Sequence, residues 1–525
     1  MEWDNKPSDL TLARAKQSIK KERTFLSGDD SDVSYSERLI LTRNGEKTIY
    51  DAAAPCNRCG ICAAVCPSYK ATKKENMSPR GRCQLTRLLK EYRISSPEKA
   101  LNEAIGSCLL CGACENICHA SIPIPEIVME LRRHYLKRRT NLITRLGLRL
   151  LLDHPKIYSF WIKTCLILLN LRLSWLAKIL GMPYLLAMSR ERFDEMGFVP
   201  PVRSGLDILR PQYQNPPKHS VKWVYFASCA TNYLMPQAAV DAVELIDRHE
   251  GEGMLAGNIC CGFMSYRLGN LDQAREFAKR NIRIFEELRK KHGNKFVVIT
   301  ECSSCASFLK NYEQLFIQDR LEEDIIAESV ETVHIVENRE GKDSNAVNPS
   351  TQENPYSVNE DVSNKKDPEN WRARAREFSD AVKDLSEILN VQDFAKIGKC
   401  AEEEGQTICF QQPCSISESL KKGRQVENLL EHLSGICFKE FEGNAECCGG
   451  DRGNSVVPEK VRHYSEYRKT KALASVQAEI VLSTDPCCIM AMRSCLKKWY
   501  PSAQAMHLCS YINRIEKKYR KGRTD

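Results

Sequence analysis

The 525-residue sequence predicts an α+β multidomain protein in which a helical domain precedes two copies of an α/β unit. Cysteine runs at 56–66 and 108–118, with apolar residues at helical spacing between them, predict the helical domain. The order of strand, helix and strand recurs in 221–320 and 405–512, which predicts the repeat. With 42% hydrophobic and 28% charged residues, the composition is that of a globular chain and excludes disorder throughout.

Cysteine usage is the unusual feature of the composition, because the chain has 25 cysteines in tight clusters. A secreted disulfide scaffold is disfavoured, since such chains are short, carry a signal peptide and usually have an even cysteine count. Here the count is odd and residues 1–30 are polar without an apolar core. We therefore expect a cytoplasmic protein with reduced thiols.

Changes in composition divide the chain into segments. Five prolines between 200 and 217 mark a connector, and residues 338–369 are rich in Asn, Ser, Glu, Lys and Pro without periodicity. Apolar residues of 371–391 line up on one helical face. We predict a polar mobile lead at 1–45, the helical domain at 46–130, a basic amphipathic helical segment at 131–200, the first α/β unit at 221–325, a disordered linker at 338–369 and the second α/β unit at 370–515.

Positive charge is concentrated in residues 131–190, which hold twelve Lys and Arg against one acid, Asp153. The longest uncharged run there, Thr164 to Leu171, is far shorter than the ~18–20 residues that span a bilayer. Two interpretations stay open: an amphipathic surface that contacts an anionic membrane or a membrane partner, or helices packed on the protein with Arg and Lys facing water. No nucleic-acid reader motif accompanies the charge, so we expect no nucleic-acid partner.

The two cysteine runs have the spacing of bacterial ferredoxins. The first is Cys56-x2-Cys59-x2-Cys62-x3-Cys66-Pro67, and the second is Cys108-x2-Cys111-x2-Cys114-x3-Cys118. In this pattern three cysteines hold a [4Fe–4S] cluster and the fourth ligand comes from the other run. A zinc site or buried structural thiols are the alternatives. The prediction is a helical dicluster ferredoxin domain with two [4Fe–4S] clusters, held by Cys56, Cys59, Cys62 and Cys118 and by Cys108, Cys111, Cys114 and Cys66.

A different cysteine pattern marks the first α/β unit. It consists of Cys229, the run Cys260-Cys261-Gly262, and the pair Cys302-x2-Cys305. Cys229 and Cys302 follow predicted strands, and ligands of open α/β sheets gather at that edge. The five thiols therefore predict either a further iron–sulfur cluster or a catalytic redox dithiol at Cys260 and Cys261, and buried thiols without a redox role are the alternative.

The second α/β unit repeats this pattern incompletely, with Cys414, Cys447-Cys448-Gly449 and Cys487-Cys488. Alignment of the two units places Asp485 opposite Cys302. Three interpretations stay open for Cys414, Cys447, Cys448 and Cys488: a metal site with fewer thiolates, one site completed by both units, or buried thiols. We call the two repeats CCG units.

The other residues carry no recognisable cofactor site. The chain has no Gly-x-Gly-x-x-Gly, P-loop or Ser/His/Asp signature, so no cofactor beyond the clusters is expected and substrate chemistry belongs to a partner. The cysteines outside the motifs are expected to be small core residues. They are Cys83, Cys165, Cys400, Cys409, Cys437, Cys495 and Cys509.

Two ferredoxin runs followed by two CCG units resemble the iron–sulfur subunit of glycolate oxidase. Similar arrangements occur in the C subunit of anaerobic glycerol-3-phosphate dehydrogenase and in heterodisulfide reductase. Matching details are Ser78-Pro-Arg-Gly-Arg82 and a helix at Val382-Lys-Asp-Leu-Ser-Glu-Ile-Leu389. The chain departs from these relatives at Gln411-Gln-Pro-Cys-Ser415, where they often have His-Asp-Pro-Cys-His.

The resemblance implies an iron–sulfur electron-transfer subunit of a flavin-dependent 2-hydroxyacid dehydrogenase of the glycolate or lactate type. An FAD-containing partner subunit would oxidise the substrate, and electrons would leave toward quinone or a membrane redox partner. Such a subunit is expected in the cytoplasm, peripheral at the inner face of the membrane. The alternative is a heterodisulfide reductase-like subunit whose first CCG unit is catalytic, and a third possibility is a non-redox scaffold that uses metal structurally.

Overall fold

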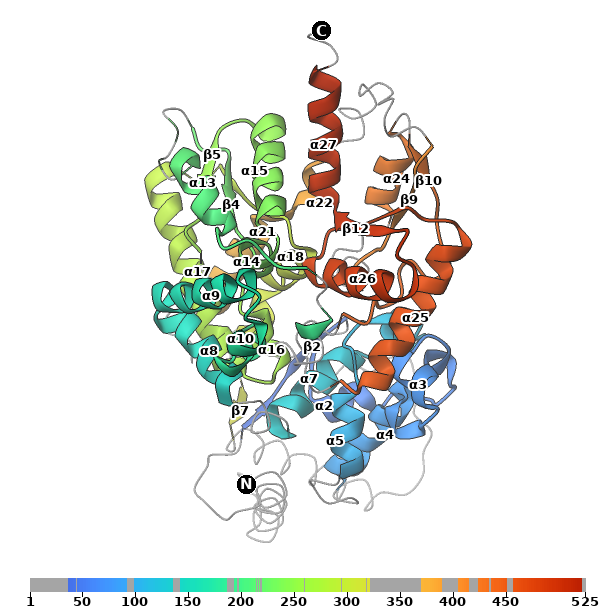
Figure 1. The fold of residues 1–525 in the computed structure, drawn as a ribbon. Helices are drawn as coiled ribbons and strands as arrows, with labels where there is room; N and C mark the ends of the chain where they lie inside the picture. The colour runs from blue at the N-terminus through green and yellow to red at the C-terminus, as the bar shows by residue number, and fades with distance from the viewer. Residues whose placement is uncertain are drawn as a thin grey trace, which may run out of the picture.

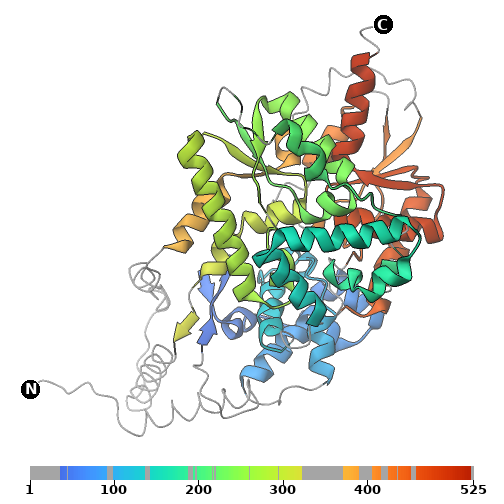
Figure 2. The same ribbon diagram turned by 60° about the vertical axis from the view of Figure 1, so that its left-hand side comes forward.

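A computed structural model of the protein describes residues 36–43, 45–91, 99–135, 142–186, 193–195, 198–213, 215, 217, 220–258, 260–293, 295–317, 319–321, 370–389, 405–414, 424–433, 436–450 and 457–521. The predicted linker at 338–369 and Cys400 lie outside these residues. Figures 1 and 2 show helical layers at the N-terminal end of the chain and two α/β units beside them.

The N-terminal region is helical, as predicted. Its longer helices are α4 (Pro79–Lys90), α5 (Lys99–Gly106) and α7 (Ile124–Tyr135), with the short α2 (Ile49–Ala53), α3 (Pro67–Thr72) and α6 (Ala113–Asn116) around them. Ser78 caps α4, because its side chain accepts a hydrogen bond from Gly81 N and Pro79 takes the first helical position. The motif Ser78-Pro-Arg-Gly-Arg82 is thus a helix start that points the following side chains into the domain.

Part of the predicted mobile lead is ordered. Residues 36–38 form β1 (Ser36–Arg38), which pairs antiparallel with β7 (Asp319–Leu321). β2 (Ile40–Thr42) pairs with β3 (Gly45–Lys47), and Ile40 is buried in the core. The prediction for 1–45 is therefore wrong at its C-terminal end, because Ile40 gains a buried position that a polar composition does not reveal.

The basic segment holds four described helices. It contains α8 (Leu142–Asp153), α9 (Pro155–Asn170), α10 (Ser174–Ile179) and α11 (Met182–Leu185). These helices lie together at one side of the molecule (Figure 1). Tyr158, Ile162 and Leu166 pack one face of α9 into the core. None of the described helices is long and apolar enough to cross a bilayer.

Two four-stranded parallel sheets have the same topology, which confirms the predicted repeat. The first has the order β5-β4-β6-β8 and contains β4 (Trp223–Tyr225), β5 (Gly253–Leu255), β6 (Val297–Thr300) and β8 (Val382–Asp384). The second has the order β10-β9-β11-β12 and contains β9 (Thr407–Phe410), β10 (Cys437–Phe438), β11 (Ile480–Ser483) and β12 (Gln504–His507). In each unit the chain reverses its strand order between the first and third strands, and open sheets place ligand sites at that point.

One predicted boundary is wrong. The sequence predicts a helical segment over 371–391 at the start of the second unit, but within the described residues 370–389 only α21 (Trp371–Asp380) and the short α22 (Leu385–Ile388) are helical. Between them β8 pairs in parallel with β6, from Val298 with Val382 to Thr300 with Asp384. The pairing completes the first sheet, so the segment belongs to the first unit and the second begins after it.

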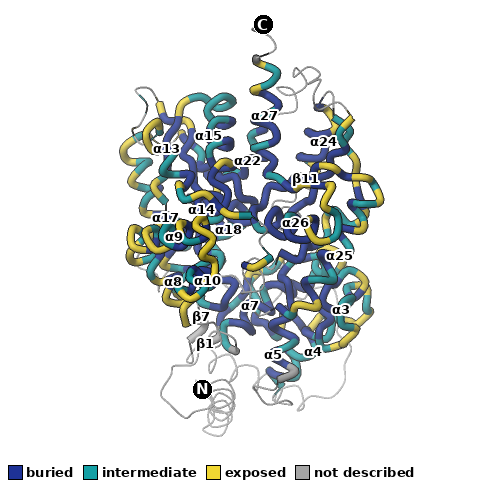
Figure 3. The backbone as a smooth tube through the Cα atoms, viewed as in Figure 1, coloured by how far each residue is buried: buried dark blue, intermediate teal, exposed yellow. Residues whose placement is uncertain are grey.

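The units share their cores. One apolar cluster joins the ferredoxin helices, α8–α11 and part of the first sheet, and another joins the second sheet to α15 (Pro236–Glu250). The long α27 (Leu508–Lys521) packs on α15, where Arg248 bonds Glu516 at 2.9 Å. The helix α25 (Glu459–Ser475) of the second unit packs on α3 of the ferredoxin region. Figure 3 shows buried backbone (dark blue) in each of these regions, including parts of α7, α15 and α26 (Pro486–Trp499).

Candidate metal centres

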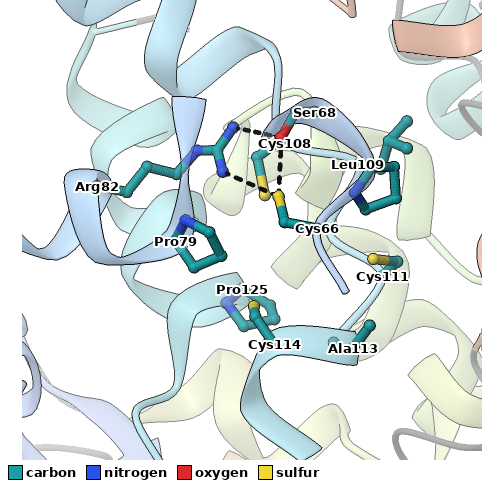
Figure 4. Close-up of a pocket in the computed structure, with 12 residues that line it drawn as sticks. Cys66, Ser68, Pro79, Arg82, Cys108, Leu109, Cys111, Ala113, Cys114 and Pro125 are labelled. Atoms are coloured by element: carbon teal, nitrogen blue, oxygen red, sulfur yellow. Dashed lines mark hydrogen bonds between the residues drawn. The ribbon is translucent and has the colours of Figure 1, made fainter. Parts of the chain in front are cut away.

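Four thiols line one cavity in the ferredoxin region. Cys66 lies just before α3, Cys108 and Cys111 lie in the loop after α5, and Cys114 lies in α6. Figure 4 shows these side chains around the same space. The cavity therefore brings together one cysteine of the first run with three of the second, which is the exchanged ligand set that the spacing predicts.

A buried arginine organises this cavity. Arg82, in the first turns of α4, donates from Nη2 to Ser68 Oγ at 3.0 Å and to Ser107 Oγ at 2.8 Å, and Nη1 lies 3.9 Å from Cys66 Sγ. Burial alone would lower the pKa of Arg82, but the thiols of Cys108 and Cys66 raise it above its usual value. The sequence motif contained Arg82, but sequence reasoning gave it no role.

The thiols of this cavity need a cation to ionise. Burial raises the pKa of the Cys111 and Cys114 thiols well above the usual value. Thiolate binding to iron supplies the missing positive charge and releases the protons. The donor set, four thiols with one buried guanidinium beside them, fits a [4Fe–4S] cluster in its chemistry.

The other predicted set lies at the domain surface. Cys59 is exposed, whereas Cys56, Cys62 and Cys118 are half-buried. Burial raises the pKa of Cys62, and Cys56, Cys118 and Cys66 raise it further. Among the described residues no group of three or more His, Cys, Asp or Glu side chains is arranged to hold a single metal ion.

Cys83 is closer to this set than the sequence suggested. It is buried in α4, and its hydrogen bond with Cys56 lowers the pKa of Cys56 to about 6. The sequence position of Cys83, four residues after the start of α4, did not predict its contact with Cys56. Cys83 is a core residue, as expected, but it also contacts Cys56, a predicted cluster ligand.

The first CCG unit gathers its five thiols at the carboxyl end of its sheet. Cys229 begins α14 (Cys229–Leu234), and Cys302 is the N-cap of α18 (Ser303–Leu309). Cys261 Sγ lies 3.4 Å from Cys305 Sγ, and Cys229 hydrogen-bonds Cys260. The structure thus brings Cys229, Cys260, Cys261, Cys302 and Cys305 together, which suits either a cluster or a dithiol.

Gly262 shapes the loop that carries Cys260 and Cys261. Its φ is +86°, and a Cβ there would meet Phe277 Cβ at 2.8 Å. Its N–H lies 3.5 Å from Cys260 Sγ. Only glycine combines this backbone conformation with close packing on α17 (Leu271–His292).

The second CCG unit also gathers thiols. Cys448 Sγ lies 3.1 Å from Cys488 Sγ, and Cys447 hydrogen-bonds Cys414. Lys469 is buried beside them, and burial lowers its pKa to about 8. Because a lysine next to buried thiols favours thiolates, this environment differs from that of ordinary core cysteines. Sequence reasoning missed Lys469, which α25 brings to the site from 21 residues after Cys448.

Asp485 replaces a thiol at the contact between the two units. Its carboxylate accepts hydrogen bonds from Cys487 N at 2.9 Å and Cys488 N at 3.3 Å, and from the Ser304 hydroxyl of the first unit. It also raises the pKa of Cys302. The aligned positions Asp485 and Cys302 therefore lie close together across the interface of the two repeats.

The thiol sets follow one another through the molecule. Beyond the effect of burial, Cys66 raises the pKa of Cys62, and Cys414 of the second CCG unit raises the pKa of Cys111. Leu109, Cys111, Cys447 and Val461 share one small apolar cluster. The second unit, and not only the first, thus lies against the ferredoxin region.

Comparison with known proteins identifies the domains. A 4Fe-4S dicluster domain matches residues 52–122, and a cysteine-rich domain matches twice, at 223–310 and 408–493. The chain is 23% identical to a probable glycolate oxidase iron–sulfur subunit of Bacillus subtilis, over 87% of this chain and 92% of the relative. It is 21% identical to lactate utilization protein A of the same organism, over 55% of this chain and 97% of the relative.

A third relative belongs to an enzyme with a different reaction. The D subunit of the dihydromethanophenazine:CoB–CoM heterodisulfide reductase of Methanosarcina acetivorans is 23% identical, over 82% of this chain and 86% of the relative. The class of protein is thus an iron–sulfur component of an oxidoreductase, with one dicluster domain and two cysteine-rich domains. The chain matches the glycolate oxidase iron–sulfur subunit and heterodisulfide reductase family, as its motifs predicted.

Proposed function

We propose that the chain is the iron–sulfur electron-transfer subunit of a flavin-dependent 2-hydroxyacid dehydrogenase complex of the glycolate or lactate type. An FAD-containing partner subunit oxidises the substrate, and the chain passes the electrons toward quinone. The observation that carries this proposal is the succession of thiol sets: Cys66, Cys108, Cys111 and Cys114 line one cavity, and Cys111 packs in one apolar cluster with Cys447 of the second CCG unit. Clusters held by neighbouring thiol sets would pass electrons from one partner to another, and no substrate has to bind at the individual sets.

The ferredoxin cysteines hold two [4Fe–4S] clusters in this proposal, which supply one-electron transfer when bound. Cys66, Cys108, Cys111 and Cys114 hold one, and Cys56, Cys59, Cys62 and Cys118 hold the other. Ser68 and Arg82 orient Cys66, because Cys66 Sγ lies 3.1 Å from Ser68 Oγ and 3.9 Å from Arg82 Nη1. Ser68 is itself held by Arg82 Nη2 and by its own hydrogen bond to Met77 O, each at 3.0 Å.

The CCG units follow the ferredoxin clusters in the proposed electron path. Cys229, Cys260, Cys261, Cys302 and Cys305 hold a further cluster or act as a redox dithiol at Cys260 and Cys261. The thiols of Cys414, Cys447, Cys448 and Cys488 lie beside buried Lys469, which supports a metal site with fewer thiolates there. Asp485 links this set to the first unit through Ser304.

A heterodisulfide reductase-like activity is the second candidate. The complete thiol set of the first CCG unit and the similarity to one subunit of a heterodisulfide reductase favour it. In this candidate the first CCG unit is itself catalytic. Co-purification discriminates between them, since an FAD-binding subunit favours the hydroxyacid complex and a haem-bearing membrane subunit favours the disulfide reaction.

We also propose that the complex works at the inner face of the membrane. Of 16 exposed large hydrophobic residues among those described, 11 lie between 142 and 179. On α9 the exposed Ile157, Phe160, Trp161 and Ile167 follow helical spacing on the face opposite the buried one. Exposed Arg145, Lys156 and Arg172 have no ion pair within the described parts of the chain, so they are available to anionic lipid. Figure 3 shows this exposed face of α8 and α10.

Cysteine substitution tests the proposed function. Replacing Cys260 and Cys261 with Ser is expected to leave the EPR signals of the ferredoxin clusters intact and to stop electron flow from the flavin partner to quinone. Replacing Cys437, a half-buried cysteine outside the motifs, with Ser is the matched control. Unchanged electron flow in the double variant would remove the first CCG unit from the pathway.

A further inference from the structure

A cavity of about 420 Å³ lies between the ferredoxin region and the first CCG unit. Its walls come from β2, α6 and α7 on one side and from α16 (Phe263–Arg267) and α18 on the other. Its size is that of a small-molecule site. It is distinct from the thiol cavity, although Pro125 lines both.

The cavity adjoins two thiol sets at once. Leu110, in its wall, stands between Cys108 and Cys111 of the ferredoxin set. Phe263, in the opposite wall, follows Cys260, Cys261 and Gly262 directly. A molecule bound here therefore lies beside both sets of the proposed electron path.

One wall of the cavity is aromatic. The ring centroids of Phe263 and Phe308 are 5.2 Å apart with planes tilted by 48°, and those of Tyr266 and Phe308 are 5.3 Å apart. The Arg267 guanidinium lies over the Phe263 ring at 5.4 Å and donates to Leu109 O at 2.8 Å. Aromatic side chains of this kind offer faces and edges on which another ring packs.

The opposite wall presents an acid that no other group uses. Glu126 Oε2 is shielded from solvent and has no hydrogen-bond partner among the described residues. Burial, together with the nearby Glu115, raises the pKa of Glu126 to about 8, although its own backbone N–H and Arg38 oppose the shift. Arg38 is itself paired with Glu130 at 3.5 Å, and Arg43 lies 3.8 Å from Glu115. A protonated carboxyl that lacks a partner is a hydrogen-bond donor for a carbonyl oxygen.

We propose that this cavity binds the ring of a quinone, with Glu126 donating to one carbonyl oxygen and Phe263, Tyr266 and Phe308 packing on the ring. A neutral ring with carbonyl acceptors suits both walls, because the charged groups of the lining are of both signs: Arg43 is paired with Glu115, and Arg267 lies over the Phe263 ring. The choice of a quinone rests on the proposed function, which needs an electron acceptor next to the thiol sets.

Binding measurements on the full-length chain with its clusters reconstituted test the proposal. A short-chain azidoquinone is expected to label peptides that contain Glu126 or Phe308. By calorimetry, Glu126→Leu and Phe308→Ala are each expected to weaken binding of the unmodified short-chain quinone about five- to tenfold. Glu126→Gln keeps a donor and should bind within about twofold of wild type. Iron content and EPR spectra confirm that each variant is folded and loaded.

The outcomes separate this proposal from the proposed function. Labelling outside the cavity, or equal binding by Glu126→Leu and Glu126→Gln, would overturn the quinone site. If the flavin partner still reduces the clusters in that case, the proposed function stands. Conversely, quinone binding in the cavity without cluster reduction by a flavin partner would leave the site in place and contradict the proposed function.

Discussion

At the scale of single residues, charge and backbone conformation around the thiols decide what they do. Arg82 is 2% exposed, and its positive charge interacts with the cavity thiols. A fixed positive charge next to a cluster stabilises its reduced form, because reduction adds a negative charge. The ligand thiols were predictable from their spacing, whereas this charge was not.

Substitution of Arg82 tests its role. Arg82→Leu is expected to lower the reduction potential of the adjacent cluster by tens of millivolts and to destabilise the fold by about 2–4 kcal/mol, because Ser68 and Ser107 lose their partner. Arg82→Lys keeps the charge and should shift the potential less. EPR-monitored redox titration measures the shift, and equal potentials in all three proteins would contradict the assignment.

Gly262 gives a test with an internal control. Gly262→Ala combines a left-handed backbone (φ +86°) with a contact to Phe277, so a loss of about 2–4 kcal/mol and a lower metal content are expected. Gly257→Ala has a similar φ of +67° but open space around it, so only about 1 kcal/mol is expected. Thermal unfolding and metal analysis compare the two, and equal losses would show that packing at Gly262 does not matter.

Glu126 should also give the stability of the chain a pH dependence. Its folded pKa, about 8, is above its unfolded value, so folding takes up a proton and stability falls as pH rises from about 5 to 8. Glu126→Gln removes this contribution. Denaturant unfolding at pH 5.5 and 8 should therefore show a smaller loss in the variant, and an equal loss in both proteins would contradict a buried neutral carboxyl.

At the scale of elements, repeated strands and helices were predictable because each carries its own periodicity. The segment 371–389 was not, since Val382-Lys-Asp is too short for a period of two to stand out from the flanking helical pattern. A local signal did exist: Asp384 and Glu387 form a capping box, which marks a new helix start at Leu385 and hence a break before it. The strand β8 directly follows α21 in the chain. No sequence pattern places α21 beside the first sheet, so the pairing of β8 with β6 was not predictable.

The exposed apolar side chains of helices α8–α10 are predicted to bind anionic membranes. Phe160→Ser with Trp175→Ser removes two rings that are 68% and 60% exposed, and binding to vesicles containing anionic lipid should weaken at least tenfold. Tyr467→Ser, at an exposed ring elsewhere, should bind like wild type. Co-sedimentation measures binding, and unaltered binding of the double variant would favour a protein partner for this face.

At the scale of the whole molecule, the packing of α25 on α3 sets the relation between the domains. It brings Cys414 and Cys447 beside Cys111, although about 300 residues separate them in the chain. No local pattern encodes that proximity, because it depends on contacts between distant elements. The sequence therefore predicted the thiol sets and the two-sheet repeat, but not that the second repeat lies against the ferredoxin region.

The central claim is that the thiol sets hold iron–sulfur clusters for electron transfer, and metal analysis tests it most directly. Protein purified without oxygen should contain about eight irons and eight sulfides from the ferredoxin region, and about twelve or more if a CCG unit also holds a cluster. Replacing Cys111 with Ser should lower the count, whereas replacing Cys437 with Ser should not. Zinc in place of iron, with no acid-labile sulfide, would contradict the account.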